Sequence, residues 1–198
     1  MNLVFDLGGV LVRWDPEAII AEVFKDEDVK ARVRDGVFGH ADWLELDRGT
    51  LTREDAIRRA AQRTQISESE ITRLLHQVPP SLGVFPDTVD LVHRLKRKGH
   101  PLYCLSNMHF ASIEYLEKTH TFWDVFDGAV ISCRLQLCKP EPQIYAHLLT
   151  TYDLKAADTL FIDDVQKNLD AAARLGIHTL RFENATQCER ELRALALI

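Results

Sequence analysis

The sequence predicts an α/β protein with a parallel sheet covered by helices on both faces, and with a helical segment inserted after the first strand. Short apolar runs alternate with amphipathic helical stretches, which is typical of a parallel sheet. The apolar runs are continuous, as in strands that are buried on both faces. The long gap between the first two runs exceeds a single crossover helix and predicts an insertion.

Five strands and five helices are expected to form the main body. The helix directly before the second strand ends in the basic turn Lys96–Lys98 before Gly99, and Gly176 is placed to end a later helix. The strands are expected at residues 2–6, 100–105, 128–132, 159–163 and 178–182. The helices are expected at residues 87–98, 110–118, 140–150, 167–175 and 186–196.

Residues 16–80 show helical patterns without a convincing strand. Thr52 and Ser67 are typical helix N-caps, and Glu70 stands in the capping-box position relative to Ser67. We expect four or five helices that end at Pro79-Pro80. The predicted division is an α/β core of residues 1–14 and 85–198 with a helical cap of residues 15–84; the alternative is one body in which these helices pack directly on the sheet.

Composition and charge exclude several classes of protein. The net charge of −6 disfavours a general nucleic-acid binder, because no basic excess neutralises phosphates. No apolar run reaches the ~18 residues of a membrane span, and the N-terminus lacks the pattern of a signal peptide. The four cysteines lack zinc-site spacing, which favours buried free thiols and a cytoplasmic protein. The sequence does not predict an oligomeric state.

Four polar motifs follow or adjoin the predicted strands, where ligands of open parallel sheets bind. Asp6 ends the first strand and can act as a nucleophile if a metal ion neutralises the incoming anion. Gly8 and Gly9 permit a tight turn beside a ligand. Ser106 and Asn107 can donate hydrogen bonds to a phosphate group.

The remaining two motifs supply a cation and a pair of acids. Lys139 lies between a cysteine and Pro140, at the start of a helix. Asp163 and Asp164 directly follow an apolar strand, and their mutual repulsion is relieved by a divalent cation, for which oxygen ligands favour Mg²⁺. Taken singly, each motif has an ordinary alternative as a turn, a helix cap or a surface residue. Their order along the chain is the specific signal.

In that order, the four motifs strongly resemble those of the haloacid-dehalogenase-like hydrolases. The motifs are Asp6-Leu-Gly-Gly-Val, Leu105-Ser-Asn, Lys139-Pro-Glu-Pro and Ile162-Asp-Asp. They are most similar to the branch that contains α-D-glucose-1-phosphate phosphatase and the N-terminal phosphatase domain of soluble epoxide hydrolase. The resemblance implies a Rossmann-like sheet, a small helical cap and Mg²⁺-dependent hydrolysis of small phosphorylated metabolites such as sugar phosphates.

The resemblance also implies a role for each matching residue. Asp6 attacks phosphorus and forms an aspartyl-phosphate, and Lys139 neutralises charge on it and on the phosphoryl group. Ser106, Asn107 and Lys139 bind the phosphoryl group. The expected Mg²⁺ ligands are Asp6, the backbone carbonyl of Gly8 and Asp164, with Asp163 near the water shell of the ion.

One position departs from this pattern. Most phosphatases of the family carry a second Asp two residues after the nucleophile as general acid and base, whereas this chain has Gly8, although some members of the branch also have glycine. Asp15 is a nearby acid, but Pro16 after it favours a helix N-cap. The alternatives are therefore a 2-haloacid dehalogenase, or a phosphometabolite-binding protein with little turnover.

Overall fold

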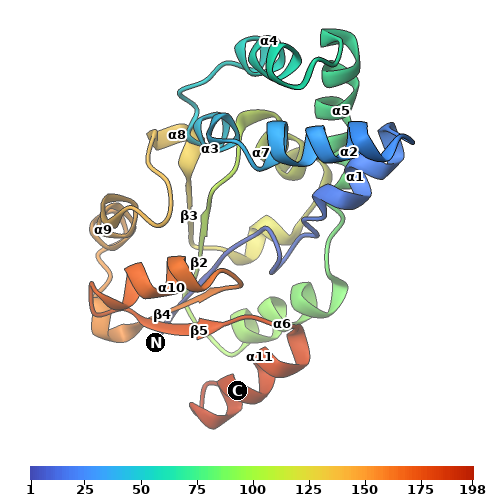
Figure 1. The fold of residues 1–198 in the computed structure, drawn as a ribbon. Helices are drawn as coiled ribbons and strands as arrows, with labels where there is room; N and C mark the ends of the chain where they lie inside the picture. Colours follow the sequence, from blue (N-terminus) through green and yellow to red (C-terminus); the bar gives the residue numbers. More distant parts are fainter.

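The computed structural model describes residues 1–198 and contains a five-stranded parallel sheet with the strand order β3-β2-β1-β4-β5 (Figure 1). Leu3 of the central strand lies opposite Leu102 on one side and Leu160 on the other, so the ends of three strands meet. The predicted strands are confirmed, as β1 (Asn2–Phe5), β2 (Leu102–Ser106), β3 (Gly128–Ile131), β4 (Thr159–Asp163) and β5 (His178–Arg181).

Helices cover both faces of the sheet, which confirms the predicted α/β class. Alternate residues of each strand point to opposite faces, so Leu3 and Phe5 enter one apolar cluster and Val4 enters another. The first cluster includes α6 (Pro86–Arg97), α7 (Phe110–Thr119) and α11 (Ala185–Ala194). The second includes α9 (Pro142–Thr151) and α10 (Gln166–Ala173). Short helical turns lie at η2 (Phe122–Val125), α8 (Ser132–Leu135) and η3 (Ala156–Asp158).

The segment between β1 and α6 is helical, as predicted. Thr52 caps α4 by accepting a hydrogen bond from the backbone of Asp55, and Ser67 and Glu70 form the expected capping box at the start of α5. The helices are α1 (Pro16–Val23), α2 (Glu27–Val33), the π-helical turn η1 (Arg34–Phe38), α3 (Ala41–Arg48), α4 (Arg53–Thr64) and α5 (Glu68–Ser81).

The expected end of these helices at Pro79-Pro80 is wrong by one residue, because α5 continues to Ser81. The fixed φ of proline suits a helix. A proline in the last turn lacks the backbone N–H of a helical hydrogen bond, but few helical hydrogen bonds follow it. Leu82 ends the helix and donates its backbone N–H to the carbonyl of Pro79.

Helices α1–α5 gather at one end of the molecule and share an apolar cluster of their own, which includes Ile20, Ile71 and Leu74 (Figure 1). The two chain segments that join them to the rest of the protein run side by side. Arg13 donates its backbone N–H to Gly83 at 2.7 Å, and Phe85 donates to Leu11 at 2.8 Å. The division at residues 14/15 and 84/85 stays a prediction, and these paired connections lie at its predicted boundaries.

Two further expectations concern the whole chain. All four cysteines are free and buried, as the sequence indicates. None of the helices combines the length and the apolar character needed to span a lipid bilayer.

Candidate active site

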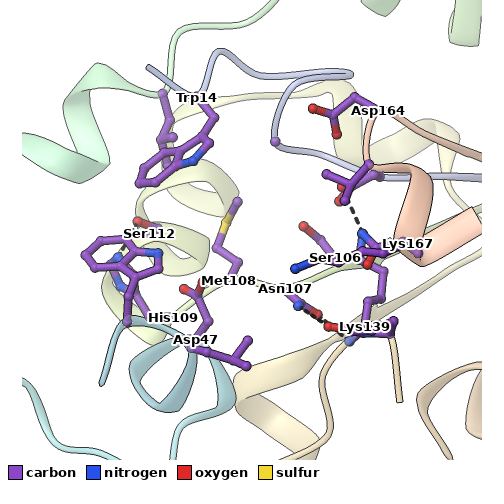
Figure 2. A pocket seen from close by; sticks show the side chains of 18 residues that line it. Trp14, Asp47, Ser106, Asn107, Met108, His109, Ser112, Lys139, Asp164 and Lys167 are labelled. Carbon is purple, nitrogen blue, oxygen red and sulfur yellow. Dashed lines mark hydrogen bonds and ion pairs between the residues drawn. The ribbon is translucent and has the colours of Figure 1, made fainter. Parts of the chain in front are cut away.

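A cavity of about 300 Å³ lies where the ends of the central strands meet the inserted helices. Figure 2 shows side chains that project into it from two opposing walls. The sheet wall consists of the loop and strand-end residues Asp6, Ser106, Asn107, Lys139 and Asp164. The helix wall consists of residues on or next to helices, namely Trp14, Trp43, Asp47, His109 and Ser112. The four motifs singled out by the sequence therefore converge on one cavity.

Asp6 directly follows β1, and hydrogen bonding of its backbone N–H to Ile162 of β4 fixes its place. Its carboxylate accepts a hydrogen bond from the backbone N–H of Leu7 at 2.7 Å, and its other oxygen lies 2.8 Å from Nζ of Lys139. Burial raises the pKa of Asp6 to about 7, although the Lys139 ammonium opposes this and the Asp163 carboxylate adds to it. Asp6 is thus a buried carboxyl whose charged form requires cationic neighbours.

Lys139 lies between the carboxylates of Asp6 and Asp163 and pairs with both. Its Nζ also lies 2.7 Å from Asp163, and its side chain is almost wholly buried. Burial lowers the pKa of Lys139, but Asp6 and Asp163 outweigh this effect and keep it above its usual value. Asp163 also accepts hydrogen bonds from the side-chain amide of Asn168 and the backbone N–H of Val165. Its oxygens are thereby engaged by protein donors, and Asp163 positions Lys139.

Three carboxylates form the only cluster suited to a metal ion. Oxygen atoms of Asp6, Asp163 and Asp164 lie within 4.8 Å of one another. Burial raises the pKa of Asp164, and the neighbouring Asp163 adds to this. A Cβ on Gly9, where φ is +75°, would lie 2.4 Å from the Asp164 carboxylate, so glycine is required for this close approach. Since Lys139 supplies one positive charge for three acids, the donor set fits a hard divalent cation such as Mg²⁺.

Ser106 and Asn107 differ in how their side chains are used. The Ser106 hydroxyl is buried in the cavity wall and has no hydrogen-bond partner in the protein. Buried polar atoms are normally paired, so this hydroxyl is available to a ligand. The Asn107 amide instead donates to the carbonyl of Lys139 at 2.9 Å and accepts from its N–H at 2.8 Å. Asn107 therefore fixes the backbone that carries the lysine.

The helix wall is mainly aromatic. The rings of Trp14 and Trp43 stack at 5.5 Å, and Trp43 meets His109 edge to face at the same distance. Burial lowers the pKa of His109 to about 4, with Arg53 contributing, so its ring is neutral near pH 7. Its Nε2 lies 3.0 Å from the hydroxyl of Ser112. This wall therefore offers ring faces and neutral polar groups.

Sequence analysis missed Asp47 of the helix wall, and it predicted a structural role for Asp15, which lies outside the cavity. Asp47 on α3 lines the cavity, yet its sequence context Leu46-Asp-Arg-Gly is that of an ordinary helix end and gives no local signal. Asp15 accepts a hydrogen bond from the backbone of Ala18 and caps α1, which confirms the structural role expected for it.

Known proteins resemble this chain in sequence and in fold. The family model for haloacid dehalogenase-like hydrolases matches residues 1–176. The chain is 28% identical to a sesquiterpene phosphatase of Aspergillus oryzae, over 97% of this chain and 94% of that protein. It is also 28% identical to a D-ribitol-5-phosphate phosphatase of Bacteroides thetaiotaomicron, over 96% of each chain. Among solved structures, a magnesium complex of a Bacteroides thetaiotaomicron enzyme of this family shares the fold, with a TM-score of 0.73 and 23% identity over 96% of this chain and 98% of that one.

Proposed function

This chain belongs to the haloacid dehalogenase-like hydrolases, and we propose that it hydrolyses small phosphomonoesters through a covalent aspartyl-phosphate on Asp6. The full-length relatives matched above are phosphatases, which supports phosphatase activity for this chain. One observation carries the mechanism. The buried, unpartnered hydroxyl of Ser106 lies in the same cavity as the Asp6–Lys139 pair and Asp164, so a phosphoryl group placed there meets a nucleophile, a donor and cations together.

The residues of the sheet wall position and neutralise the reacting groups. Lys139 and the backbone of Leu7 each hold one carboxylate oxygen of Asp6, which orients this carboxylate before substrate binds. The Ser106 hydroxyl donates to a phosphoryl oxygen, and Lys139 offsets negative charge that develops during transfer. Phosphoryl transfer depends mainly on such positioning and charge neutralisation.

Mg²⁺ is the cofactor that fits this donor set. Asp6, the backbone carbonyl of Gly8 and Asp164 would hold the ion. Asp163 would not bind the ion directly but would lie near its water ligands. When bound, the ion would neutralise the phosphoryl oxygens and stabilise the charged form of Asp6. The magnesium complex of the structural neighbour supports the same choice of metal.

The substrate is proposed to be small, because the cavity of about 300 Å³ accommodates a compact metabolite. We propose that residues 15–84 act as the cap that selects it. Trp43 of this segment and Trp14, directly before it, present ring faces that suit the carbon skeleton of a sugar or another compact metabolite. The dehalogenase alternative is disfavoured, because displacement of halide has no use for the Asp6–Asp163–Asp164 cluster.

The decisive experiment measures release of inorganic phosphate from a panel of sugar and alkyl phosphates, with Mg²⁺ and with EDTA. We expect turnover with Mg²⁺ only, and a phosphoryl group trapped on Asp6 by acid quench. Asp6→Asn should abolish both signals. Halide release from a 2-chloroacid without metal would support the dehalogenase instead, and tight phosphate binding without turnover would support a binding protein.

Metal binding is tested separately by thermal unfolding. Mg²⁺ should raise the melting temperature of the wild type, because a ligand that binds only the folded state stabilises it. Asp164→Asn should lose this shift, whereas Asp170→Asn should keep it, since Asp170 is a surface residue that is hydrogen bonded to Gln166. An equal shift in both variants would contradict the proposed metal site.

A further inference from the structure

The proposed reaction lacks an obvious proton donor for the leaving oxygen. Gly8 has no side chain and lines the cavity where the resemblance expects an acid. Three carboxyl-bearing residues line the cavity, and two of them, Asp6 and Asp164, belong to the metal cluster. The third is Asp47 on α3, which lies on the opposite wall (Figure 2). If the sheet wall holds the phosphoryl group at Ser106, its leaving group would extend toward that wall.

The end of α3 is held firmly against the rest of the protein. The backbone carbonyl of Asp47 accepts a hydrogen bond from Ser132 Oγ at 2.5 Å, and Ser132 Oγ accepts one from the N–H of Met108 at 2.9 Å. Arg48 pairs with Glu141 through two hydrogen bonds of 2.5 and 2.8 Å. Through Ser132, Asp47 is connected to the loop after β2, and through its neighbour Arg48 to the segment after Lys139, so its position is set relative to the sheet wall.

Close packing at Gly49 has the same effect. Gly49 has φ +81°, and a Cβ there would lie 2.5 Å from the carbonyl oxygen of Cys133. Only glycine therefore allows α3 to end so close to α8. A rigid support of this kind is what a group that acts on substrate needs.

The pKa of Asp47 allows this carboxyl to give and take a proton near neutral pH. Burial raises the pKa of Asp47 to about 7, a hydrogen bond from the backbone of His109 lowers it, and the Asp6 carboxylate raises it further. The cavity holds three other titratable side chains besides the metal cluster. His109 is neutral and contacts Ser112, and Lys139 is engaged by Asp6 and Asp163. Lys167 lies on the sheet side of the cavity, opposite Asp47 (Figure 2).

We propose that Asp47 is the general acid and base of the reaction, in place of the acid that Gly8 lacks; this inference rests on the proposed phosphatase function. In the first step, a bond forms between Asp6 Oδ and phosphorus, the bond between phosphorus and the ester oxygen breaks, and Asp47 gives its proton to that oxygen. In the second step, the Asp47 carboxylate takes a proton from water as the water oxygen bonds to phosphorus. The bond from phosphorus to Asp6 then breaks, and inorganic phosphate leaves.

The test compares esters whose leaving groups differ in their need for a proton. p-Nitrophenolate leaves unprotonated, whereas an alkoxide requires a proton. Asp47→Asn should lower kcat/KM for alkyl phosphates by about 10²–10³-fold, the usual contribution of a general acid, and for p-nitrophenyl phosphate by less than about fivefold. Asp15→Asn is the matched control, because its carboxylate caps α1 outside the cavity, and it should leave both substrates unaffected.

A rescue variant sharpens the test. A Cβ on Gly8 would contact only Cβ of Trp14, at 3.8 Å, and Gly8 is not among the glycines with positive φ, so an aspartate fits there. The double variant Gly8→Asp/Asp47→Asn should have a kcat/KM for alkyl phosphates at least about tenfold above that of Asp47→Asn alone, because the new carboxyl on the sheet wall can donate the proton.

Two outcomes would overturn the role of Asp47. One is an equal loss for aryl and alkyl phosphates in a folded Asp47→Asn protein. The other needs no variant: a wild-type kcat/KM that falls steeply as the leaving-group pKa rises, because an acid-assisted reaction is insensitive to it. Absence of phosphate release from every ester by the wild type would instead overturn the proposed function itself, and this inference with it.

Discussion

The two walls of the cavity differ in how their polar groups are paired. On the sheet wall, Asp6 and Asp163 share the Lys139 ammonium within 2.8 Å, and backbone donors complete the network. On the helix wall, the Trp14 and Trp43 rings stack, His109 is neutral near pH 7, and the pKa of Asp47 is raised to about 7. The sheet wall therefore gathers its acids around one ammonium group, whereas the helix wall offers ring faces and a carboxyl without a cationic partner.

This difference follows from the elements that build each wall. Parallel strands in register bring residues from distant parts of the chain to one edge, with positions set by backbone hydrogen bonds. The helix wall is set by side-chain packing between helices and by the contacts at the end of α3. Substitutions on the two walls should therefore differ in kind: loss of charge balance on one, and loss of substrate fit on the other.

The largest effect is expected for Lys139→Met. Removal of the ammonium leaves Asp6 and Asp163 buried without their partner, which should destabilise the protein by about 3–5 kcal/mol. Turnover should also fall by more than about 10³-fold, since a charged donor at the reacting group is lost. Urea unfolding monitored by circular dichroism measures the first effect, and phosphate release measures the second.

Arg134→Met provides the control. Arg134 pairs with Glu117 on the surface, where both side chains are about two-fifths exposed, and such pairs contribute about 0–1 kcal/mol. If Lys139→Met and Arg134→Met unfolded at the same urea concentration, the buried ion pairs of the sheet wall would contribute no more to stability than a surface ion pair, which would contradict the prediction.

An intermediate effect is expected for Trp14→Ala. Trp14 is partly exposed and stacks on Trp43, so its removal takes away a ring face of the cavity and little of the core. We expect KM for the preferred phosphate to rise by about 3- to 10-fold with kcat nearly unchanged, which corresponds to the ~0.5–1.5 kcal/mol of an aromatic contact. A fall in kcat with unchanged KM would assign the ring to the chemical step instead.

The smallest effect is expected for Asp15→Ala. Loss of the N-cap of α1 should reduce the free energy of unfolding by about 1 kcal/mol, and kcat and KM should stay at wild-type values. Chemical denaturation and steady-state kinetics measure both. A large kinetic defect would show that Asp15 takes part in the reaction.

Much of the fold was predictable, because continuous apolar runs mark buried strands and the glycine after the Lys96–Lys98 turn marks the end of α6. The convergence of Asp6, Ser106 and Asp164 followed from the rule that strand ends meet at one edge, and the place of Lys139 beside them was implied by the family resemblance. Two features were not predictable. The use of Asn107 to hold the Lys139 backbone depends on how two loops pack, and Asp47 faces the cavity only because α3 lies across α8.

The paired connections around Val12 and Val84 place the two ends of the helical segment beside each other. A segment whose ends adjoin can be exchanged between proteins by joining two neighbouring points, as in natural domain insertion. Recombination at these points would transplant Trp43 and Asp47 together, and Trp14 as well if the joint lies before it, whereas His109 and Ser112 at the start of α7 would stay with the recipient. Asp6, Ser106, Lys139 and Asp164 would remain with the recipient, so new substrate preferences could arise in a lineage while the phosphoryl-transfer residues were inherited unchanged.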